Sequence, residues 1–241
     1  MSLAVEIQGL ARKLSRKLAP LAFPPPVEYV YDAFNYAFPG YEAYTSKYAT
    51  NRKRVLFLGM NPGPWGMAQT GVPFGEIPAV RDWMGINVPI GKPDPEHPKR
   101  PVEGFGCQKS EVSGRRLWGY FAEKFGEAGN FFGDHFVINY CPLAFMADTA
   151  RNITPDKLPA QVAKELEETC DWHLREITKA LSPEWVVGVG GFAEKRAMEA
   201  LEGMGLKFGR ILHPSPASPA ANRDWAGTAG KQLLEQGIWK A

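Results

Sequence analysis

The sequence predicts an α/β protein in which a mostly parallel sheet carries helices on both faces. Short apolar runs at 55–58, 136–138, 185–189 and 208–212 have the length and composition of buried strands. Between them lie long loops and stretches with helical periodicity, and a repeated strand–loop–helix order is typical of parallel sheets. The first run, VLFL, holds four large apolar residues in succession, as expected of a strand covered on both faces.

Size, composition and charge bound the possible partners. With 241 residues, 44% of them hydrophobic, the chain can form one sizeable domain, or two at most. We expect a single domain over 1–241, with a helix and a proline-rich connection at 1–26 packed on it. The net charge is only +2, so an anionic partner would have to be bound by a local patch. No apolar run approaches the ~18 residues of a membrane span, so we expect none. We also expect no membrane as partner and a monomer.

Cysteine usage and the amino terminus indicate the compartment. Cys107, Cys141 and Cys170 are odd in number, far apart and form no CxxC, which argues against a disulfide framework, a zinc site or an iron–sulfur cluster. The amino terminus lacks the pattern of a secretory signal, although an organelle transit peptide stays an alternative. We expect an intracellular protein, in the cytoplasm or nucleoid of a bacterium or the nucleus of a eukaryote.

The amino-terminal quarter predicts one helix and an aromatic cluster. Leucine and isoleucine recur at three- and four-residue steps from Leu3 to Leu21, which predicts a helix docked on the core with a basic side toward solvent, ended by the prolines at 24–26. Eight aromatic residues follow between Tyr29 and Tyr48. We expect them to pack in the core or in a lid, and base stacking is the alternative.

The middle of the chain predicts a long loop over 77–108 and then a helix with Ser113 as its N-cap. Arg115 and Arg116 would lie in the first turn of this helix, which is unfavourable for the helix dipole unless an anion lies nearby. A polar loop at 149–159 precedes a further helix that ends near residue 181.

The carboxyl-terminal third predicts two more helices, at 192–201 and about 225–236. His173 borders an apolar helical stripe and is interpreted as structural, and His97 and His135 have no partner signal. The segment GVGGFA at 188–193 fits a loose dinucleotide fingerprint. That match is weak because no acidic residue ends the following strand.

Polar and glycine residues follow the four predicted strands at the point where each one ends. They are Asn61, Asn139, Gly190 and His213, and the carboxyl ends of parallel strands meet at one sheet edge, where open α/β sheets bind ligands. The Gly/Pro-rich loop at 59–75 adds Phe74 and a stiff backbone that a ligand can approach closely. We expect a pocket with two carboxamides, an imidazole and a phenyl ring, and with no carboxylate, thiol or lysine.

Such a pocket suits recognition of a planar heterocycle and its stabilisation as a leaving anion. A serine hydrolase would require a GxSxG nucleophile elbow, and phosphoryl transfer a P-loop lysine or acidic metal ligands, and these motifs are missing. The Pro-Ser-Pro segment after His213 predicts a stiff protruding loop that can insert into a stack of bases.

Two long motifs carry a family resemblance. GMNPGPWGMAQTGVPFGE at 59–76 and HPSPASPAANR at 213–223 closely resemble the signature motifs of the single-strand-selective monofunctional uracil-DNA glycosylases. The segments NYCPL at 139–143, RNITPDKLPA at 151–160 and VVGVGG at 186–191 resemble the same family in the same order. The similarity runs from about Val27 to the end, and it implies a three-layer α/β/α fold around a central, mostly parallel four-stranded sheet.

The resemblance implies roles for particular residues. Asn61 would position the attacking water, and His213 would stabilise charge that grows on uracil O2 as the N-glycosidic bond breaks. Phe74 would stack on the flipped-out uracil, and Asn139 would pair with its Watson–Crick edge. Met60 would offer its backbone to the base, and Gly63 would leave room beside C5. The expected base-binding residues are thus Met60, Gly63, Phe74 and Asn139.

The resemblance also implies a DNA contact surface built from the two later motifs. Its expected residues are Thr149, Arg151, Asn152, Pro214, Ser215, Pro216, Ala217, Ser218, Asn222 and Arg223. Relatives can carry a larger, basic residue where this chain has Ala217. Which side chain fills the gap left by the flipped base therefore stays open among Ser218, Asn222 and Arg223.

The implied function is a DNA glycosylase of base excision repair without cofactor or metal. Its partner would be uracil-containing DNA, single- or double-stranded, and its substrates uracil and oxidised or 5-substituted uracils such as 5-hydroxymethyluracil, with other deaminated bases as further candidates. A non-catalytic single-stranded nucleic-acid-binding module is the alternative that also explains the aromatics and loops. A nucleotide-binding oxidoreductase built on 188–193 is a second alternative.

Overall fold

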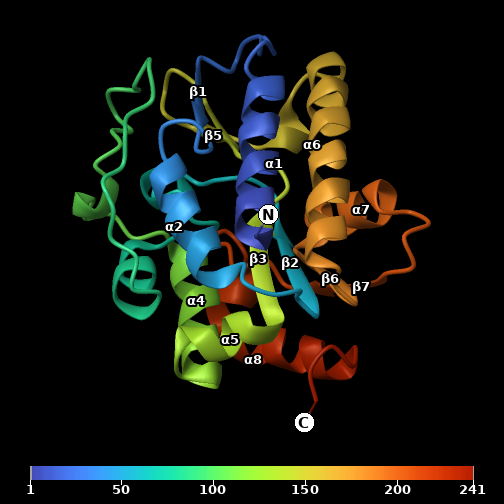
Figure 1. Cartoon of the computed structure of the whole chain (residues 1–241). Coiled ribbons are helices and arrows are strands. Elements are labelled where there is room, and N and C mark those ends of the chain that lie inside the picture. Colours follow the sequence, from blue (N-terminus) through green and yellow to red (C-terminus); the bar gives the residue numbers. More distant parts are fainter. Residues whose placement is uncertain (1, 241) are drawn as a thin grey trace.

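The computed structural model describes residues 2–240, and its centre is a parallel sheet of the strands β3-β2-β6-β7 (Figure 1). These are β2 (Val55–Gly59), β3 (His135–Asn139), β6 (Trp185–Val189) and β7 (Lys207–Ile211). All neighbouring pairs run parallel. The predicted strands are confirmed to within one residue, because fully buried strands in a parallel sheet carry the strongest apolar signal.

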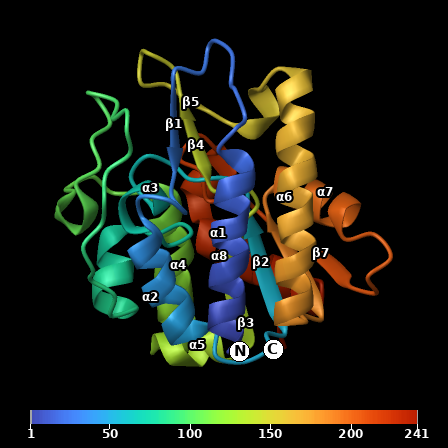
Figure 2. The same ribbon diagram turned by 45° about the horizontal axis from the view of Figure 1, so that its top comes forward.

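Helices cover both faces of this sheet, as predicted. α1 (Leu3–Leu18) lies beside α6 (Ala160–Leu181) on one face, and α4 (Val112–Phe125) and α8 (Pro219–Glu235) lie behind the sheet in Figures 1 and 2. α7 (Gly191–Ala200) connects β6 to β7. The aliphatic stripe of α1 is buried in the same core as β2 and β3, which follows from its three- and four-residue spacing.

The aromatic stretch forms β1 (Tyr29–Asp32) and α2 (Phe38–Tyr48). Its rings lie mostly in the core, and the Tyr44 hydroxyl donates to the Val137 carbonyl at 3.1 Å. This bond fixes α2 to β3, so the core interpretation is confirmed and base stacking is not supported.

A second sheet was not predicted. β1 pairs antiparallel with β4 (Leu143–Met146), which pairs with β5 (Asn152–Ile153). β4 begins four residues after β3 ends, so this small sheet stands directly beside the carboxyl edge of the parallel one. Its strands have two to four residues, too few for the sequence to show alternation.

The helices differ from the sequence prediction in several places, and α1 ends at Leu18 rather than near Leu21. Ser113 is not the N-cap of α4, because the helix begins at Val112, Glu111 takes the cap position and Ser113 is buried in the first turn. α5 (Ala128–Asp134) was not predicted. The predicted start of the last helix at Trp225 corresponds to a break within α8, where Asp224 has extended backbone angles.

The two longest connections contain short helical turns. α3 (Met67–Thr70) lies in the Gly/Pro-rich loop, and the long loop at 77–108 contains only a π-helical turn (Ala79–Trp83) and a 3₁₀ turn (Gly104–Gly106). A further 3₁₀ turn (Pro155–Lys157) precedes α6. Within residues 2–240 the structure contains no helix with the length and apolar character of a membrane span.

The three histidines outside the pocket are all structural. His97 accepts from the Lys99 N–H at 3.0 Å and reaches the Asp148 carbonyl at 3.1 Å, which joins the long loop at 77–108 to the turn between β4 and β5. His135 accepts from the Trp239 indole at 2.9 Å. His173 is buried, with no hydrogen-bond partner for either ring nitrogen in the described chain. The structural interpretation of His173 is confirmed, and the structure gives His97 and His135 partners that the sequence did not indicate.

Candidate active site

A cavity of about 420 Å³ opens at the carboxyl edge of the parallel sheet. The structure brings together there all six residues expected to act on the base, from four separate segments of the chain. They are Met60, Asn61, Gly63, Phe74, Asn139 and His213. From the expected DNA contact residues, only Asn152, Ser215 and Pro216 also line this cavity among residues 2–240.

Asn139, the last residue of β3, has a buried side chain with an unused acceptor. Its Nδ2 lies 3.3 Å from the Met67 sulfur, and its Oδ1 has no hydrogen-bond partner within residues 2–240. A buried carbonyl without a donor costs about 1–3 kcal/mol, so native structures rarely leave one unpaired without a reason. The amide is therefore preset to accept from a ligand N–H.

Gly59 makes room for this amide. A methyl group at Gly59 would lie 2.3 Å from Oδ1 of Asn139 and 2.5 Å from a ring carbon of Phe74. No side chain can be accommodated there, so glycine is required for the close approach of the amide and the ring.

Phe74 is held in an unusual backbone conformation. Its φ is +54°, which non-glycine residues seldom adopt and which is found preferentially at functional sites. α4 fixes this conformation, because the Trp118 indole donates to the Phe74 carbonyl at 3.1 Å and Gly114 lets the helix approach that carbonyl closely. The half-buried ring lies 6.2 Å from the His213 ring, and the two lie at an angle of 45°.

Asn61 and Met60 are positioned by the chain that links the two sheets. The Asn61 Nδ2 donates to the Leu143 carbonyl at 3.0 Å, which leaves Oδ1 as the free acceptor of this half-buried amide. The Met60 carbonyl accepts from the Cys141 N–H at 2.9 Å, so its backbone is fixed in the pocket wall. The small sheet, which supplies Leu143, thus orients the candidate water-positioning residue.

His213 follows β7 and has a neutral imidazole at pH 7. Burial lowers its pKa below the ordinary value, and within the described chain neither ring nitrogen has a hydrogen-bond partner. The preceding residue is fixed by two bonds, from the Trp225 indole to the Leu212 carbonyl and from the Leu212 N–H to Gln232, each at 2.7 Å. Gly190, with φ of +94°, packs against His213: a methyl group there would lie 3.1 Å from its Cβ. The dinucleotide interpretation of 188–193 has no support, because His213 occupies the space beside Gly190 that a dinucleotide would need.

Glu111 was missed, and the expectation of a pocket without a carboxylate is wrong. Its side chain lines the cavity beside two glycines: a methyl group at Gly63 would lie 2.6 Å from its Oε2, and one at Gly66 2.9 Å from its Cγ. Burial raises the pKa of Glu111, while the nearby backbone N–H groups of Ser113 and Trp65 act in the opposite direction. No local pattern marked this residue, because its place in the cavity depends on where α4 packs.

Gly63 does not require a left-handed backbone, since its φ is not positive. The missing side chain instead makes room for Glu111, because a methyl group here would lie 2.6 Å from its Oε2.

Most of the expected DNA contact residues lie around the cavity rather than in it. Thr149, Arg151 and Arg223 are exposed. Ser218 is the N-cap of α8 and accepts from the Ala221 N–H at 3.3 Å, and the Asn222 amide donates to the Pro216 carbonyl at 2.9 Å. Ser218 and Asn222 thus use their side chains in hydrogen bonds within the protein. Of the three candidates for filling the gap left by a flipped base, Arg223 is the one whose side chain makes no such bond in the described chain.

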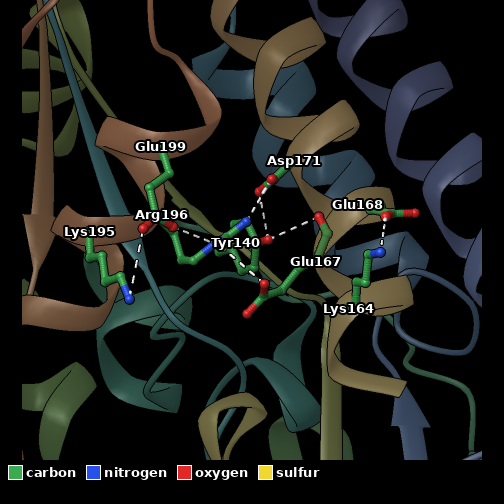
Figure 3. Close-up of polar contacts among 8 residues, drawn as sticks. All are labelled: Tyr140, Lys164, Glu167, Glu168, Asp171, Lys195, Arg196 and Glu199. Carbon is green, nitrogen blue, oxygen red and sulfur yellow. Dashed lines mark hydrogen bonds and ion pairs between the residues drawn. The ribbon is translucent and has the colours of Figure 1, made fainter. Parts of the chain in front are cut away.

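A hydrogen-bonded ion-pair network supports the pocket from behind (Figure 3). Tyr140, the residue after Asn139, donates from its hydroxyl to Asp171 of α6 at 2.7 Å. Arg196 of α7 donates to the other Asp171 oxygen at 2.6 Å and to Glu167 at 3.1 Å. The network ties the end of β3 to two helices and thereby restricts where Asn139 can lie.

The chemistry available in the cavity is hydrogen bonding, stacking and electrostatics. Within residues 2–240 no three His, Cys, Asp or Glu side chains are grouped so that they could hold a metal ion. The described lining contains no lysine that could form a Schiff base. Two amides, a neutral imidazole and a ring can bind a planar base and stabilise negative charge on it.

Comparison with known proteins places the chain in a family. A model of the "Uracil DNA glycosylase superfamily" matches residues 46–236. The single-strand selective monofunctional uracil DNA glycosylase of Mus musculus is 47% identical over 228 residues, which is 94% of this chain and 82% of that protein. The protein of the same name from Bos taurus is 46% identical over 94% of this chain and 84% of its own length. The chain belongs to the uracil DNA glycosylase superfamily. The predicted enzyme class, a monofunctional uracil-DNA glycosylase acting in base excision repair, is confirmed.

A solved structure confirms the fold of this glycosylase. The crystal structure of wild-type SMUG2 from Pedobacter heparinus superposes with a TM-score of 0.75 and covers 99% of this chain and 98% of that one. Sequence identity is 19%, so this likeness supports the α/β/α architecture alone. The family assignment gives no support to a non-catalytic binding module or to an oxidoreductase.

Proposed function

We propose that this glycosylase flips uracil out of DNA and reads its Watson–Crick edge with Asn139. The observation that carries the proposal is the buried, unpartnered Oδ1 of Asn139. Uracil presents an N3–H donor beside the O4 acceptor, and an amide matches this pair by accepting with Oδ1 and donating with Nδ2. Cytosine presents an acceptor at N3 and a donor at N4, so it would leave polar atoms of the amide unpaired.

The other pocket residues support hydrolysis of the N-glycosidic bond. Phe74 provides the ring on which the flipped base stacks, and flipping costs a few kcal/mol, least from single-stranded DNA. Asn61 offers its free Oδ1 to orient a water, but an amide is a poor general base. Bond breaking therefore runs ahead of water attack, through a state with negative charge on the base.

His213 supplies the electrostatic part of this mechanism. A neutral imidazole can donate one hydrogen bond to uracil O2 as charge develops there, which by analogy with an oxyanion-hole donor is worth ~3–4 kcal/mol. The imidazole is half-buried, and partial exclusion of water strengthens such a bond.

The finer substrate range follows from Gly63 and Glu111. Gly63 leaves space beside the base, and Glu111 bounds that space with polar atoms. A 5-hydroxymethyl group could make hydrogen bonds there, whereas the methyl of thymine would leave polar partners unpaired. We include uracil and oxidised or 5-substituted uracils among the substrates, with other deaminated bases as further candidates.

The proposal also covers the strandedness of the DNA substrate, the oligomeric state, the location of the protein and its number of domains. The relatives are named single-strand selective, and we propose that this protein acts on single- and double-stranded DNA with a preference for single strands. We further propose a monomer that works inside the cell. Residues of α1 share one hydrophobic core with the sheet, which supports a single glycosylase domain over the whole chain.

Incubation with labelled oligonucleotides tests the proposed reaction. The substrates carry uracil, 5-hydroxymethyluracil, hypoxanthine, xanthine or, as a control, thymine. We expect base release that yields a strand cut only after alkali, undiminished by EDTA, with uracil excised and thymine not. Intact uracil oligonucleotides after alkali would contradict the proposal, as would a nicked product formed without alkali or heat.

A further inference from the structure

Arg116 of α4 contacts the loop that carries His213. We call residues 213–218 the His213 loop. One guanidinium nitrogen of Arg116 donates to the Pro214 carbonyl at 3.1 Å and to the Ser215 carbonyl at 3.2 Å, and another donates to the Asn222 side-chain oxygen at 2.8 Å. The two ends of this contact are about a hundred residues apart in sequence, and it fixes the loop to α4.

Asn222 extends this contact to the next residue of the loop. Its Nδ2 donates to the Pro216 carbonyl at 2.9 Å while its Oδ1 accepts from Arg116. The carbonyls of three consecutive residues, 214 to 216, are thus held by one guanidinium and one amide. The guanidinium is suited to this task because its donors form a planar, rigid fork.

Two further hydrogen bonds lie within the loop itself. Prolines 214 and 216 have no N–H, the Ala217 N–H donates to the Ser215 hydroxyl at 3.1 Å, and the Ser218 N–H donates to the Ser215 carbonyl at 3.1 Å. Pro216 and Ala217 are exposed at the tip. The loop therefore presents an apolar, preshaped tip toward solvent.

We propose that Arg116 is a positioning residue that keeps the His213 loop preformed as a wedge for opening duplex DNA. This inference rests on the proposed function. A base in a duplex is paired and stacked, whereas one in a single strand is already partly free, so extraction from a duplex depends more on a rigid wedge. Rigid preorganisation avoids the entropy cost of ordering the loop on DNA. Arg116 should therefore matter more for double-stranded than for single-stranded substrate.

The test measures single-turnover excision of uracil from one sequence as a single strand and as a duplex. The variants are Arg116→Ala, Arg116→Lys and the control Arg115→Ala, which removes the same charge from the exposed neighbouring residue. For Arg116→Ala we expect the ratio of duplex to single-strand rate to fall about tenfold or more. Arg116→Lys should lie close to Ala because an ammonium cannot reproduce the fork. Arg115→Ala should keep the parental ratio.

Hydrogen exchange separates this proposal from the proposed function. Peptides covering 213–222 should exchange faster in Arg116→Ala than in the parent or in Arg115→Ala. Exchange in the other peptides and the thermal midpoint of the protein should stay unchanged. Equal losses on both substrates, or unchanged exchange of this segment, would overturn the positioning role. Absence of uracil excision by the parent on either substrate would instead overturn the proposed function, while the exchange result would still report on Arg116.

Discussion

Asn139 and Tyr140 are consecutive residues at the end of β3, and their polar atoms are in opposite situations. The Tyr140 hydroxyl is bonded to Asp171, which is bonded in turn to Arg196. The Asn139 oxygen one residue earlier is buried with no partner in the described chain. Behind the pocket the Tyr140 hydroxyl and both Asp171 oxygens are paired within the protein, whereas in the pocket the Asn139 oxygen is left for a ligand. Ligand binding and stability are thus assigned to neighbouring residues, and the two can be tested separately.

The largest expected effect is on the pocket side. Asn139→Asp replaces the amide donor with a carboxylate, which cannot donate to uracil O4 at neutral pH. We expect a loss of uracil excision of ~10⁴ or more, because a mismatched buried polar edge is strongly rejected. Single-turnover rates measure it, with the thermal midpoint as a control for folding. If the variant stays within tenfold of the parent, Asn139 does not read the base.

The next effect is on the support side. Arg196→Met removes the guanidinium that pairs with Asp171, and the Arg196 side chain is only 12% exposed. Removing one partner of a largely buried ion pair leaves the other uncompensated, so we expect about 3 kcal/mol of lost unfolding free energy in urea. The exposed pair of Lys195 and Glu199 provides the control, and Lys195→Met should cost less than about 0.5 kcal/mol. Similar losses in the two variants would show that the network does not stabilise the fold.

Two buried histidines outside the pocket predict that the stability of the fold depends on pH. Burial lowers the pKa of His173 and of His135 to about 4, from 6.5 in the unfolded chain. The unfolded state therefore binds more protons between these values, so stability is complete above pH 6.5 and falls as the pH drops toward 4. Each histidine contributes up to about 3 kcal/mol to this fall.

His173→Leu should remove its share of this dependence, and His135 should retain the rest. Both His173 nitrogens lack partners within residues 2–240, so this variant should cost little at pH 7.5. Urea unfolding at pH 7.5, 6 and 5 measures the effect. An identical pH dependence in parent and variant would show that His173 does not titrate between the folded and unfolded states.

The smallest expected effect is a change of substrate preference at the pocket wall. Gly63→Tyr should fill the space beside Glu111 and lower the ratio of 5-hydroxymethyluracil to uracil excision about tenfold. Gly63→Ala should lower it less, because its methyl would displace the Glu111 carboxyl by only a small amount. A ratio that is the same in the parent and both variants would show that this space does not select the 5-substituent.

The sequence could predict features that leave a local pattern, but not features that depend on how distant segments pack. The four central strands and the residues that follow them were predicted because buried strands and Gly/Pro-rich loops leave local patterns. Glu111 and Arg116 were not assigned, since their roles depend on where α4 packs, and a single sequence does not show which loop a helix will face. The positive φ of Phe74 had no sequence signal either, because α4 imposes it through Trp118 and Gly114.

The most direct test of the central claim replaces one hydrogen of the substrate with a methyl group. Uracil methylated at N3 lacks the hydrogen that the Asn139 oxygen is proposed to accept. We predict that the parent excises 3-methyluracil at least about 10³-fold more slowly than uracil, and that this difference shrinks to within about tenfold in Asn139→Ala, where the acceptor is gone and the methyl has room. The same rate ratio in both proteins would contradict the claim that the unpartnered oxygen of Asn139 reads N3–H.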